Sequence, residues 1–192
     1  VIPNGINLDI FNQIQKKKNF FKKKKIIYFG RIHEKKGIEI LLEAIRDLPK
    51  NYFEKFCFEI TGPGEADYTS KINRMIKDYN IDNYVAMLLP KKGKEKIVYL
   101  QEADVFVLPS YEEGDSIALK EAMSANNAVI ISEQCRLDLV EKENAGFIIK
   151  TEKESLKNAL LKLNDCDLDM MADNSKNIIK EYFDNDHCAE RV

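Results

Sequence analysis

The chain has 192 residues, of which 44% are hydrophobic and 32% are charged, a length and composition typical of one compact globular domain. Its formal net charge of −2 gives no overall positive field that would attract nucleic acid, and we expect no nucleic-acid partner. No apolar run in the sequence approaches the length of a membrane span.

Before the first predicted strand, residues 1–24 include the opening "VIPNG" and lysine clusters at 16–18 and 22–25. We interpret the lysine clusters as a solvated linker, with attraction to anionic lipid headgroups as the alternative. Because the chain starts with Val1, we expect it to be an excised part of a larger protein.

Short apolar runs then recur, and each predicts a strand because most are continuous, as in strands covered on both faces. They lie at 25–30, 56–62, 84–88, 105–110, 128–132 and 146–150. Amphipathic patterns predict helices at 38–48, 69–80, 94–104, 116–126, 152–163 and 167–183. Strands that alternate with helices predict an α/β fold, a Rossmann-like doubly wound parallel sheet with helices on both faces.

Turn residues follow three of the predicted strands: Gly30, the stretch 62–64 and the pair 109–110. In open α/β sheets, ligands bind at the carboxyl ends of the strands, beside helix N-termini that favour anions. The candidate sites therefore lie at this edge.

The first candidate is "GRIHEKKG", Gly30 to Gly37. Gly30 would let the backbone approach a ligand closely. Arg31 would supply a planar guanidinium with several N–H donors and Lys36 a compact positive charge, a pair suited to a diphosphate. The alternative is a solvated basic turn. His33 in this loop is interpreted as a bystander rather than a base.

The second candidate, "GPGEAD" (62–67), resembles the start of a dinucleotide-binding fingerprint. Asp67 stands where the third glycine would be and would place a negative charge at the pyrophosphate position. We reject nicotinamide binding and interpret this stretch as a tight turn that borders the site.

The third candidate is "SYEEGDSIALKEAM" (110–123), in which Ser116 is a plausible N-cap of a helix. Backbone N–H groups of 114–117 would then face an anion. Glu113 lies in the preceding loop and Glu121 in the helix, so the two carboxylates could accept hydrogen bonds from different hydroxyl pairs of one ligand. Two diols that flank an anion indicate a nucleotide sugar. One alternative is that the two glutamates are ordinary surface residues that aid solubility. The other is a glycosidase with paired catalytic carboxylates, although nothing in the sequence supplies the second wall of its cleft.

Four landmarks in order resemble the C-terminal, donor-binding domain of the retaining group 1 (family 4) glycosyltransferases, which have the GT-B fold. They are "VIPNGINLDIF" (1–11), "GRIHEKKGIEILLEAI" (30–45), "EADVFVLPSYEEG" (102–114) and the E-x7-E signature "EGDSIALKEAM" (113–123). The resemblance implies that 1–24 form an interdomain junction and linker, that 25–192 form the donor domain, and that an N-terminal acceptor domain is missing.

By the same resemblance, Arg31 and Lys36 hold the diphosphate of the donor, Glu113 contacts the transferred sugar, and Glu121 contacts the ribose. The backbone of 114–117 lines the sugar and phosphate site. The implied substrate-binding residues are Gly30, Gly114, Asp115, Ser116, Ile117 and Glu121. Asp115 and Ser116 replace the usual Phe-Gly of the family, and Asp115 places a negative charge close to the expected phosphate.

The resemblance implies transfer, with retention, from a UDP-, GDP- or ADP-sugar to a hydroxyl of a saccharide or lipid-linked acceptor, in polysaccharide or glycolipid assembly. We expect no cofactor and no metal, because cations already face the diphosphate and the scattered cysteines 57, 135, 166 and 188 have no metal-binding spacing. A cytoplasmic setting is expected, with peripheral attachment at the inner face of the membrane as a further option. A nucleotide-sugar epimerase of the same fold and a non-catalytic nucleotide-sugar-binding module stay open as alternatives.

Overall fold

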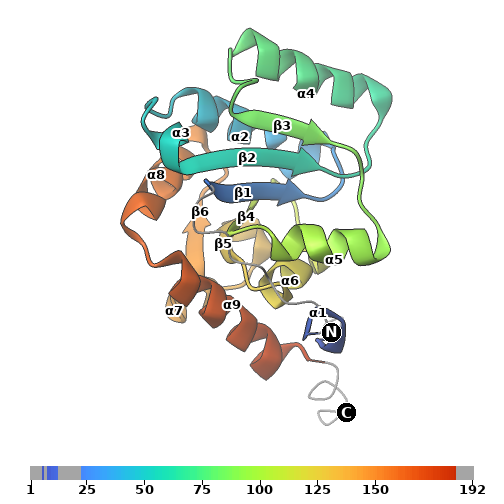
Figure 1. Ribbon diagram of the computed structural model, residues 1–192, viewed down its shortest axis with the longest axis vertical. Helices are drawn as coiled ribbons and strands as arrows, with labels where there is room; N and C mark the ends of the chain where they lie inside the picture. Colours follow the sequence, from blue (N-terminus) through green and yellow to red (C-terminus); the bar gives the residue numbers. More distant parts are fainter. Residues whose placement is uncertain (1–5, 7, 13–22, 185–192) are drawn as a thin grey trace.

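The computed structural model describes Ile6, residues 8–12 and residues 23–184. Its centre is one six-stranded, all-parallel sheet with the strand order β3-β2-β1-β4-β5-β6 (Figure 1). The strands are β1 (Lys24–Phe29), β2 (Phe56–Thr61), β3 (Val85–Leu88), β4 (Val105–Leu108), β5 (Ala128–Ser132) and β6 (Gly146–Ile149). All six predicted strands are therefore present, and the doubly wound parallel sheet is confirmed.

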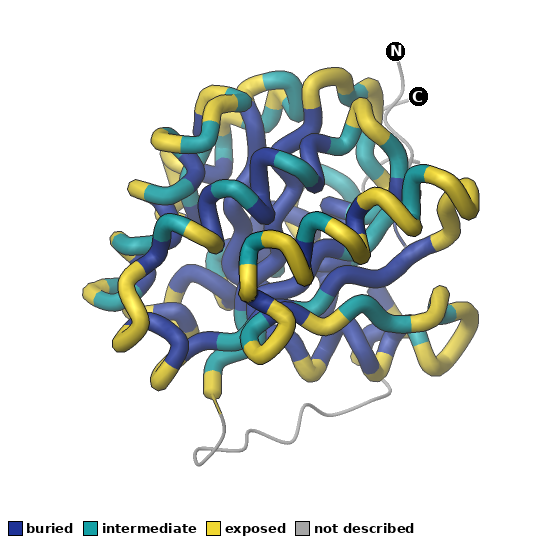
Figure 2. Tube along the Cα trace, turned by 90° about the horizontal axis from the view of Figure 1, so that it is seen from above, coloured by how far each residue is buried: buried dark blue, intermediate teal, exposed yellow. Residues whose placement is uncertain are grey.

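Apolar continuity explains why these runs form the interior of the sheet. Every residue of β4 and β5 is buried, and Ile26 and Ile27 of β1 are fully buried. A strand covered on both faces has no position for a polar side chain to reach water, so each position is apolar or small. Figure 2 shows the buried residues gathered in the interior, with the exposed ones around the outside.

Helices cover both faces of the sheet: α2 packs against α4 and α8, whereas α6 packs against α5 and α9 (Figure 1). Their bounds are α2 (Ile38–Arg46), α4 (Ala66–Asp78), α5 (Gly93–Gln101), α6 (Ile117–Ser124), α8 (Lys153–Lys162) and α9 (Leu168–Tyr182). All six predicted helices are present. The largest shifts of bounds are that α4 begins three residues earlier than predicted and that α5 ends three residues earlier.

Several short elements were not predicted, because three or four residues are too few to show a helical period. They are α1 (Asp9–Asn12), α3 (Tyr52–Lys55), α7 (Leu139–Lys142) and the 3-10 turns η1 (Glu34–Lys36), η2 (Glu133–Cys135) and η3 (Leu163–Asp165). Of these, η1 matters for the site, because it carries Lys36. Among the described residues, no helix is both long and apolar enough to cross a membrane.

The interpretation of 22–25 as a solvated linker is wrong for Lys24, which belongs to β1 together with Lys25 of the predicted strand 25–30. Lys24 and Lys25 are the first residues of β1 and pair in register with Phe56 and Cys57. The Lys24 ammonium lies 3.2 Å from Asp104, and the Lys25 ammonium 3.3 Å from Glu59. These carboxylates let two lysines start a central strand. The cluster 16–18 lies outside the described residues.

The two ends of the described chain meet. Ile6 forms a parallel bridge with Asp184, and its N–H donates to the carbonyl of Phe183 at 3.0 Å. Phe11 of α1 is buried, and its carbonyl accepts a hydrogen bond from Gln101 at 2.6 Å. This N-terminal stretch therefore packs onto the domain through α5 and the end of α9.

Candidate functional site

The strand order reverses between β1 and β4, and a cleft of about 550 Å³ opens beyond the carboxyl ends of these two strands. This is the position at which doubly wound sheets bind ligands. Most of the sequence-predicted site residues line the cleft, namely Gly30, Arg31, Lys36, Glu113, Gly114, Asp115, Ser116 and Ile117. The fold thus brings together two segments that lie about eighty residues apart.

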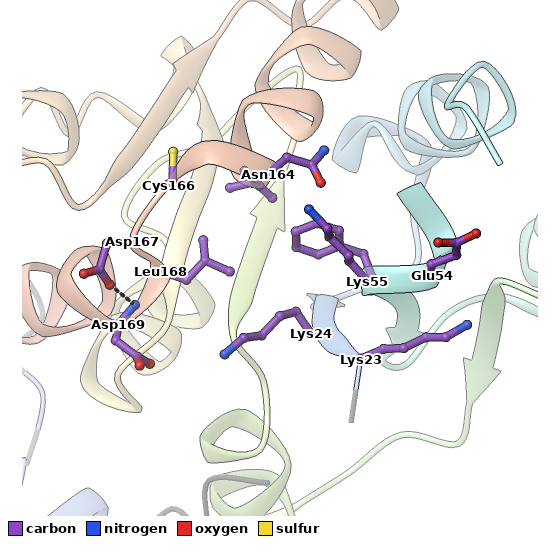
Figure 3. A pocket seen from close by; sticks show the side chains of 11 residues that line it. Lys23, Lys24, Glu54, Lys55, Asn164, Cys166, Asp167, Leu168 and Asp169 are labelled. Atoms are coloured by element: carbon purple, nitrogen blue, oxygen red, sulfur yellow. Dashed lines mark hydrogen bonds between the residues drawn. The ribbon is translucent and has the colours of Figure 1, made fainter. Parts of the chain in front are cut away.

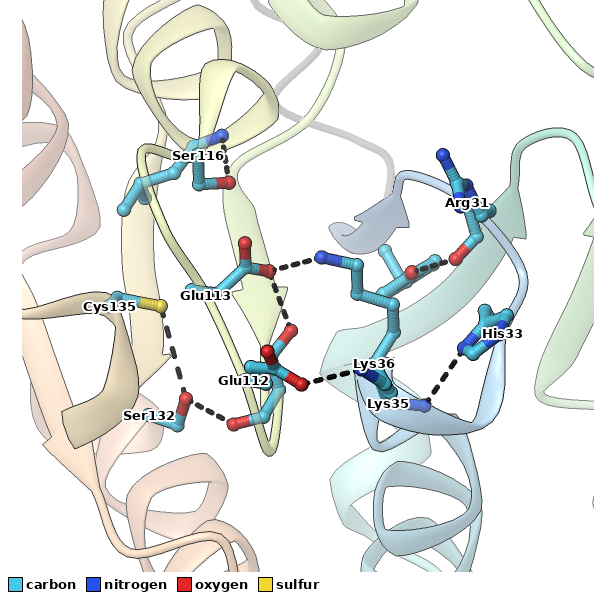
Figure 4. Close-up of polar contacts among 12 residues, drawn as sticks. Arg31, His33, Lys35, Lys36, Glu112, Glu113, Ser116, Ser132 and Cys135 are labelled. Carbon is cyan, nitrogen blue, oxygen red and sulfur yellow. Dashed lines mark hydrogen bonds and ion pairs between the residues drawn. The ribbon is translucent and has the colours of Figure 1, made fainter.

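An ion pair joins the two segments across the cleft. The Lys36 ammonium lies 2.7 Å from Oε1 of Glu113, and the Ser110 hydroxyl donates to the same oxygen at 2.8 Å (Figure 4). The Glu113 side chain is 6% exposed and the Lys36 side chain 25%. Glu113 is therefore a buried carboxylate whose charge is matched by one cation and one hydroxyl.

Close backbone packing places Lys36 opposite Glu113. Gly37, which follows η1, has φ +67°, and a Cβ at this position would lie 2.0 Å from the Pro109 carbonyl oxygen. The N–H of Tyr111 also donates to the carbonyl of Lys35 at 2.8 Å. Only glycine fits this contact without displacing backbone, so the turn after β1 rests directly on the end of β4.

Arg31 lies on the same side of the cleft as Lys36. Its carbonyl accepts a hydrogen bond from the Tyr28 hydroxyl at 2.6 Å, and its exposed side chain extends away from the Lys36–Glu113 pair (Figure 4). Burial and the neighbouring Glu113 raise the pKa of Tyr28 well above its usual value, so the phenol stays a donor. His33 Nδ1 accepts from the N–H of Lys35 at 3.2 Å, a capping contact.

The N-terminus of α6 borders the same cleft. Ser116 is its N-cap, as predicted, and the Ser116 hydroxyl accepts from the N–H of Leu119 at 3.4 Å. The first N–H groups of a helix have no intrahelical acceptor and carry a partial positive charge. An anion in the cleft would meet them at Ile117.

Asp115 does not leave its charge uncompensated beside these N–H groups. Its carboxylate lies 2.5 Å from the ammonium of Lys120, a residue of α6 whose side chain is only 5% exposed. The Lys120 ammonium also lies 4.7 Å from the centre of the Phe183 ring. The negative charge of Asp115 is therefore neutralised by Lys120.

Glu121 does not line the cleft. Its carboxylate is 2.5 Å from the ammonium of Lys96, which comes from α5, and its side chain is 15% exposed. The fold thus holds the two signature glutamates in separate ion pairs, Glu113 with the turn after β1 and Glu121 with α5.

Three contributors, Tyr28, Lys96 and Lys120, were not predicted, and Ser110 was noted only as a turn residue in the third candidate stretch. Ser110 is fully buried, and its carbonyl accepts from the hydroxyls of Ser132 at 2.7 Å and Thr151 at 3.2 Å. Its place directly after an apolar strand was a usable signal. No comparable signal marks Lys96 or Lys120, since their partners are set by helix packing.

A second hollow, of about 640 Å³, lies at the opposite edge of the sheet, where β1 and β2 begin. Figure 3 shows Lys23, Lys24 and Lys55 around it, with Asp167 and Asp169 from the start of α9. It is larger than the cleft, but it lies at the amino ends of the strands, away from the carboxyl ends at which such sheets bind ligands. We therefore assign the site to the smaller cleft. Within the described ranges, no group of three or more His, Cys, Asp or Glu side chains could hold a metal ion.

The chain is similar in sequence and in fold to known proteins. Residues 9–181 match the family model for glycosyl transferases group 1. The amylovoran biosynthesis glycosyltransferase AmsK of Erwinia amylovora is 31% identical over 155 residues, which are 77% of this chain and 37% of AmsK. The putative colanic acid biosynthesis glycosyltransferase WcaL of Escherichia coli K12 is 30% identical, again over 77% of this chain and 37% of the relative.

Among solved structures, Anabaena HepE in complex with UDP-glucose has a TM-score of 0.80 at 21% identity. The match covers 100% of this chain and 56% of HepE. Such a likeness establishes the fold, one Rossmann-like half of a GT-B protein. The chain spans well under two thirds of the length of the relatives it matches.

Proposed function

Because this chain belongs to the group 1 family of glycosyltransferases, we propose that it is the donor-binding domain of a retaining enzyme. The enzyme transfers a sugar from a nucleoside diphosphate sugar to a hydroxyl acceptor. One observation carries the proposal: a cleft at the reversal of strand order combines the Lys36 cation, the N-terminus of α6 and the buried carboxylate of Glu113. Cations and helix N–H groups suit a diphosphate, and a carboxylate suits sugar hydroxyls.

Each residue has a proposed role. Arg31 and Lys36 hold the diphosphate and stabilise the charge that develops as it departs, with the N-terminus of α6. Glu113 orients the sugar through its hydroxyls. Glu121 lies outside the cleft lining, and it is proposed to accept from the ribose where the ligand extends past the cleft toward Lys96 of α5. The backbone of Gly30 and of 114–117, including Gly114, Asp115 and Ser116, forms the wall of the cleft.

The donor is proposed to be a UDP-, GDP- or ADP-sugar, and UDP-glucose in HepE supports the first of these. Residues 1–24 are proposed as the junction to an acceptor-binding domain and 25–192 as the donor domain. AmsK and WcaL are named for polysaccharide biosynthesis. We infer a similar pathway class, with a saccharide or lipid-linked acceptor at the cytoplasmic face of a membrane.

Calorimetry on this chain tests the proposal. Titration with UDP, GDP and ADP, and with their glucose conjugates, should reveal binding of at least one diphosphate. Arg31→Ala should weaken that binding by about 1.5–3 kcal/mol, the range for a charged hydrogen bond, and should barely change binding of the bare nucleoside. Arg74, exposed on α4 and outside the cleft lining, is the matched control.

Two results would contradict the proposal. One is failure of the wild type to bind any of the three diphosphates, and the other is equal loss of nucleoside and diphosphate affinity in Arg31→Ala. Sugar transfer by this chain alone would contradict the assignment of acceptor groups to another domain. Turnover by the full-length protein separates a transferase from a binding module.

A further inference from the structure

We propose that Glu113 is the resident counter-ion of Lys36, and that this pairing makes the site select the complete nucleoside diphosphate sugar over the bare nucleoside diphosphate. The inference rests on the proposed function and goes beyond it. A diphosphate that enters the cleft has to share or take over the cation that Glu113 already holds.

The geometry of the pair supports this role. Lys36 and Ser110 both donate to Oε1 of Glu113, at 2.7 and 2.8 Å. Burial leaves this carboxylate little contact with water, so its charge depends on these two donors. The neighbouring pair Lys35–Glu112 has the same 2.7 Å separation, but its side chains are 58% and 70% exposed, so water solvates both charges.

The carboxylate is also held in place. Ser110 is fully buried and its carbonyl accepts hydrogen bonds from Ser132 and Thr151, which ties the loop to β5 and to the segment after β6. Because Ser110 is fixed, Glu113 loses its hydroxyl donor if its side chain moves toward water. When a diphosphate approaches Lys36, two anions compete for one ammonium.

The two ligands differ in what they offer Glu113 in return. The phosphates of a bare nucleoside diphosphate pair with Lys36, and the ligand has no hydroxyl donor at the sugar position. The buried Glu113 carboxylate then keeps only the hydrogen bond from the Ser110 hydroxyl. A nucleotide sugar brings hydroxyl groups that can donate to Glu113 as Lys36 turns to the phosphates. Phosphate binding and sugar binding are thereby coupled, and the diphosphate left after transfer is released more readily than the donor.

Calorimetry with the nucleoside diphosphate that binds, and with its glucose conjugate, tests this coupling on the wild type, Glu113→Gln and Glu112→Gln. Because Glu113→Gln removes the charge that competes for Lys36, it should increase the affinity for the bare nucleoside diphosphate by about fivefold to tenfold. It should leave the sugar donor equal or weaker, so that the selectivity for the donor falls. Glu112→Gln makes the same charge change on the exposed rim and should alter neither affinity by more than about twofold.

Ser110→Ala is an independent test, in which the selectivity for the donor should change in the direction opposite to that in Glu113→Gln. It removes the hydroxyl on which Glu113 relies once Lys36 is engaged, so the bare diphosphate should bind at least about threefold weaker, because a hydrogen bond to a charged carboxylate is lost. The sugar donor should be less affected, and selectivity should rise. Thermal unfolding of each variant verifies that it is folded.

The inference is overturned if both folded variants leave the ratio of the two affinities unchanged, or if Glu113→Gln does not tighten binding of the bare diphosphate, since loss of a sugar contact alone would weaken only the donor. If the wild type binds neither ligand, the proposed function itself fails. These failures are distinguishable because the first requires measurable binding by the wild type.

Discussion

Replacement of Gly37 by alanine tests whether the turn after β1 rests on the end of β4 as described. Two costs combine at this position. Its φ of +67° places an alanine in the left-handed region, and the new Cβ would lie 2.0 Å from the Pro109 carbonyl oxygen and 2.9 Å from the Pro109 carbonyl carbon. Because both contacts are with backbone, no side-chain rotation relieves them.

Gly93 separates these two costs, because it has φ +53° but no atom within 4 Å of the place that an alanine Cβ would take. Gly93→Ala should cost about 0.5–1 kcal/mol, the left-handed penalty less the entropy that alanine removes from the unfolded chain. Gly37→Ala adds the displacement of the turn from Pro109, about 1–3 kcal/mol as for an overpacked site, for a total of about 1.5–4 kcal/mol.

Urea unfolding followed by circular dichroism measures both variants, and the m-value should not change if only the native state is affected. Calorimetry adds a functional measurement, since displacement of Gly37 moves Lys36 and should weaken nucleoside diphosphate binding. A Gly37→Ala variant that loses no more stability than Gly93→Ala would refute the close contact with Pro109, and with it the explanation of how Lys36 is placed.

Two further predictions concern Glu121 and a surface ion-pair cluster. Glu121→Gln should weaken a nucleoside diphosphate by about 1.5–3 kcal/mol if the carboxylate accepts ribose hydroxyls. Inorganic diphosphate should bind as before, and calorimetry that shows equal loss for both would contradict the ribose assignment. Hydrogen bonds from Arg46 and then from Lys153 lower the pKa of Asp47 to about 2. NMR titration should show this midpoint in the wild type and a higher one in Arg46→Ala, and a wild-type midpoint near the ordinary aspartate pKa of 3.8 would refute the pairing. Because the folded-state pKa is the lower one, the cluster stabilises the fold above about pH 4, and this stabilisation is lost as the pH falls toward 2. The groups are partly exposed, so the contribution is below about 1 kcal/mol.

The sheet was predictable because its strands are buried on both faces, which leaves continuous apolar runs such as 128–132 in the sequence. The first residue of β1 was not predictable in the same way. Lys24 resembles part of a charged linker, and only the folded chain brings Asp104 close enough to pair with it.

The site was predictable to the extent that its residues follow strands or begin a helix. Gly30, Arg31 and Ser116 have such positions, and the structure brings them to one cleft. The partners of the acidic residues were not predictable. Lys96 meets Glu121 only because α5 packs beside α6, and nothing in the sequence near either residue indicates that contact.

The bridge between Ile6 and Asp184 has a topological consequence. Where the entry and exit of a compact domain are neighbours, the order of elements along the chain can be permuted without altering which strands lie side by side. A short peptide could connect the two points, and new ends could open at the exposed turn around Asp82 and Asn83, between α4 and β3. The β3-β2-β1-β4-β5-β6 arrangement and the cleft at its centre depend on neighbour packing rather than on where the polypeptide starts.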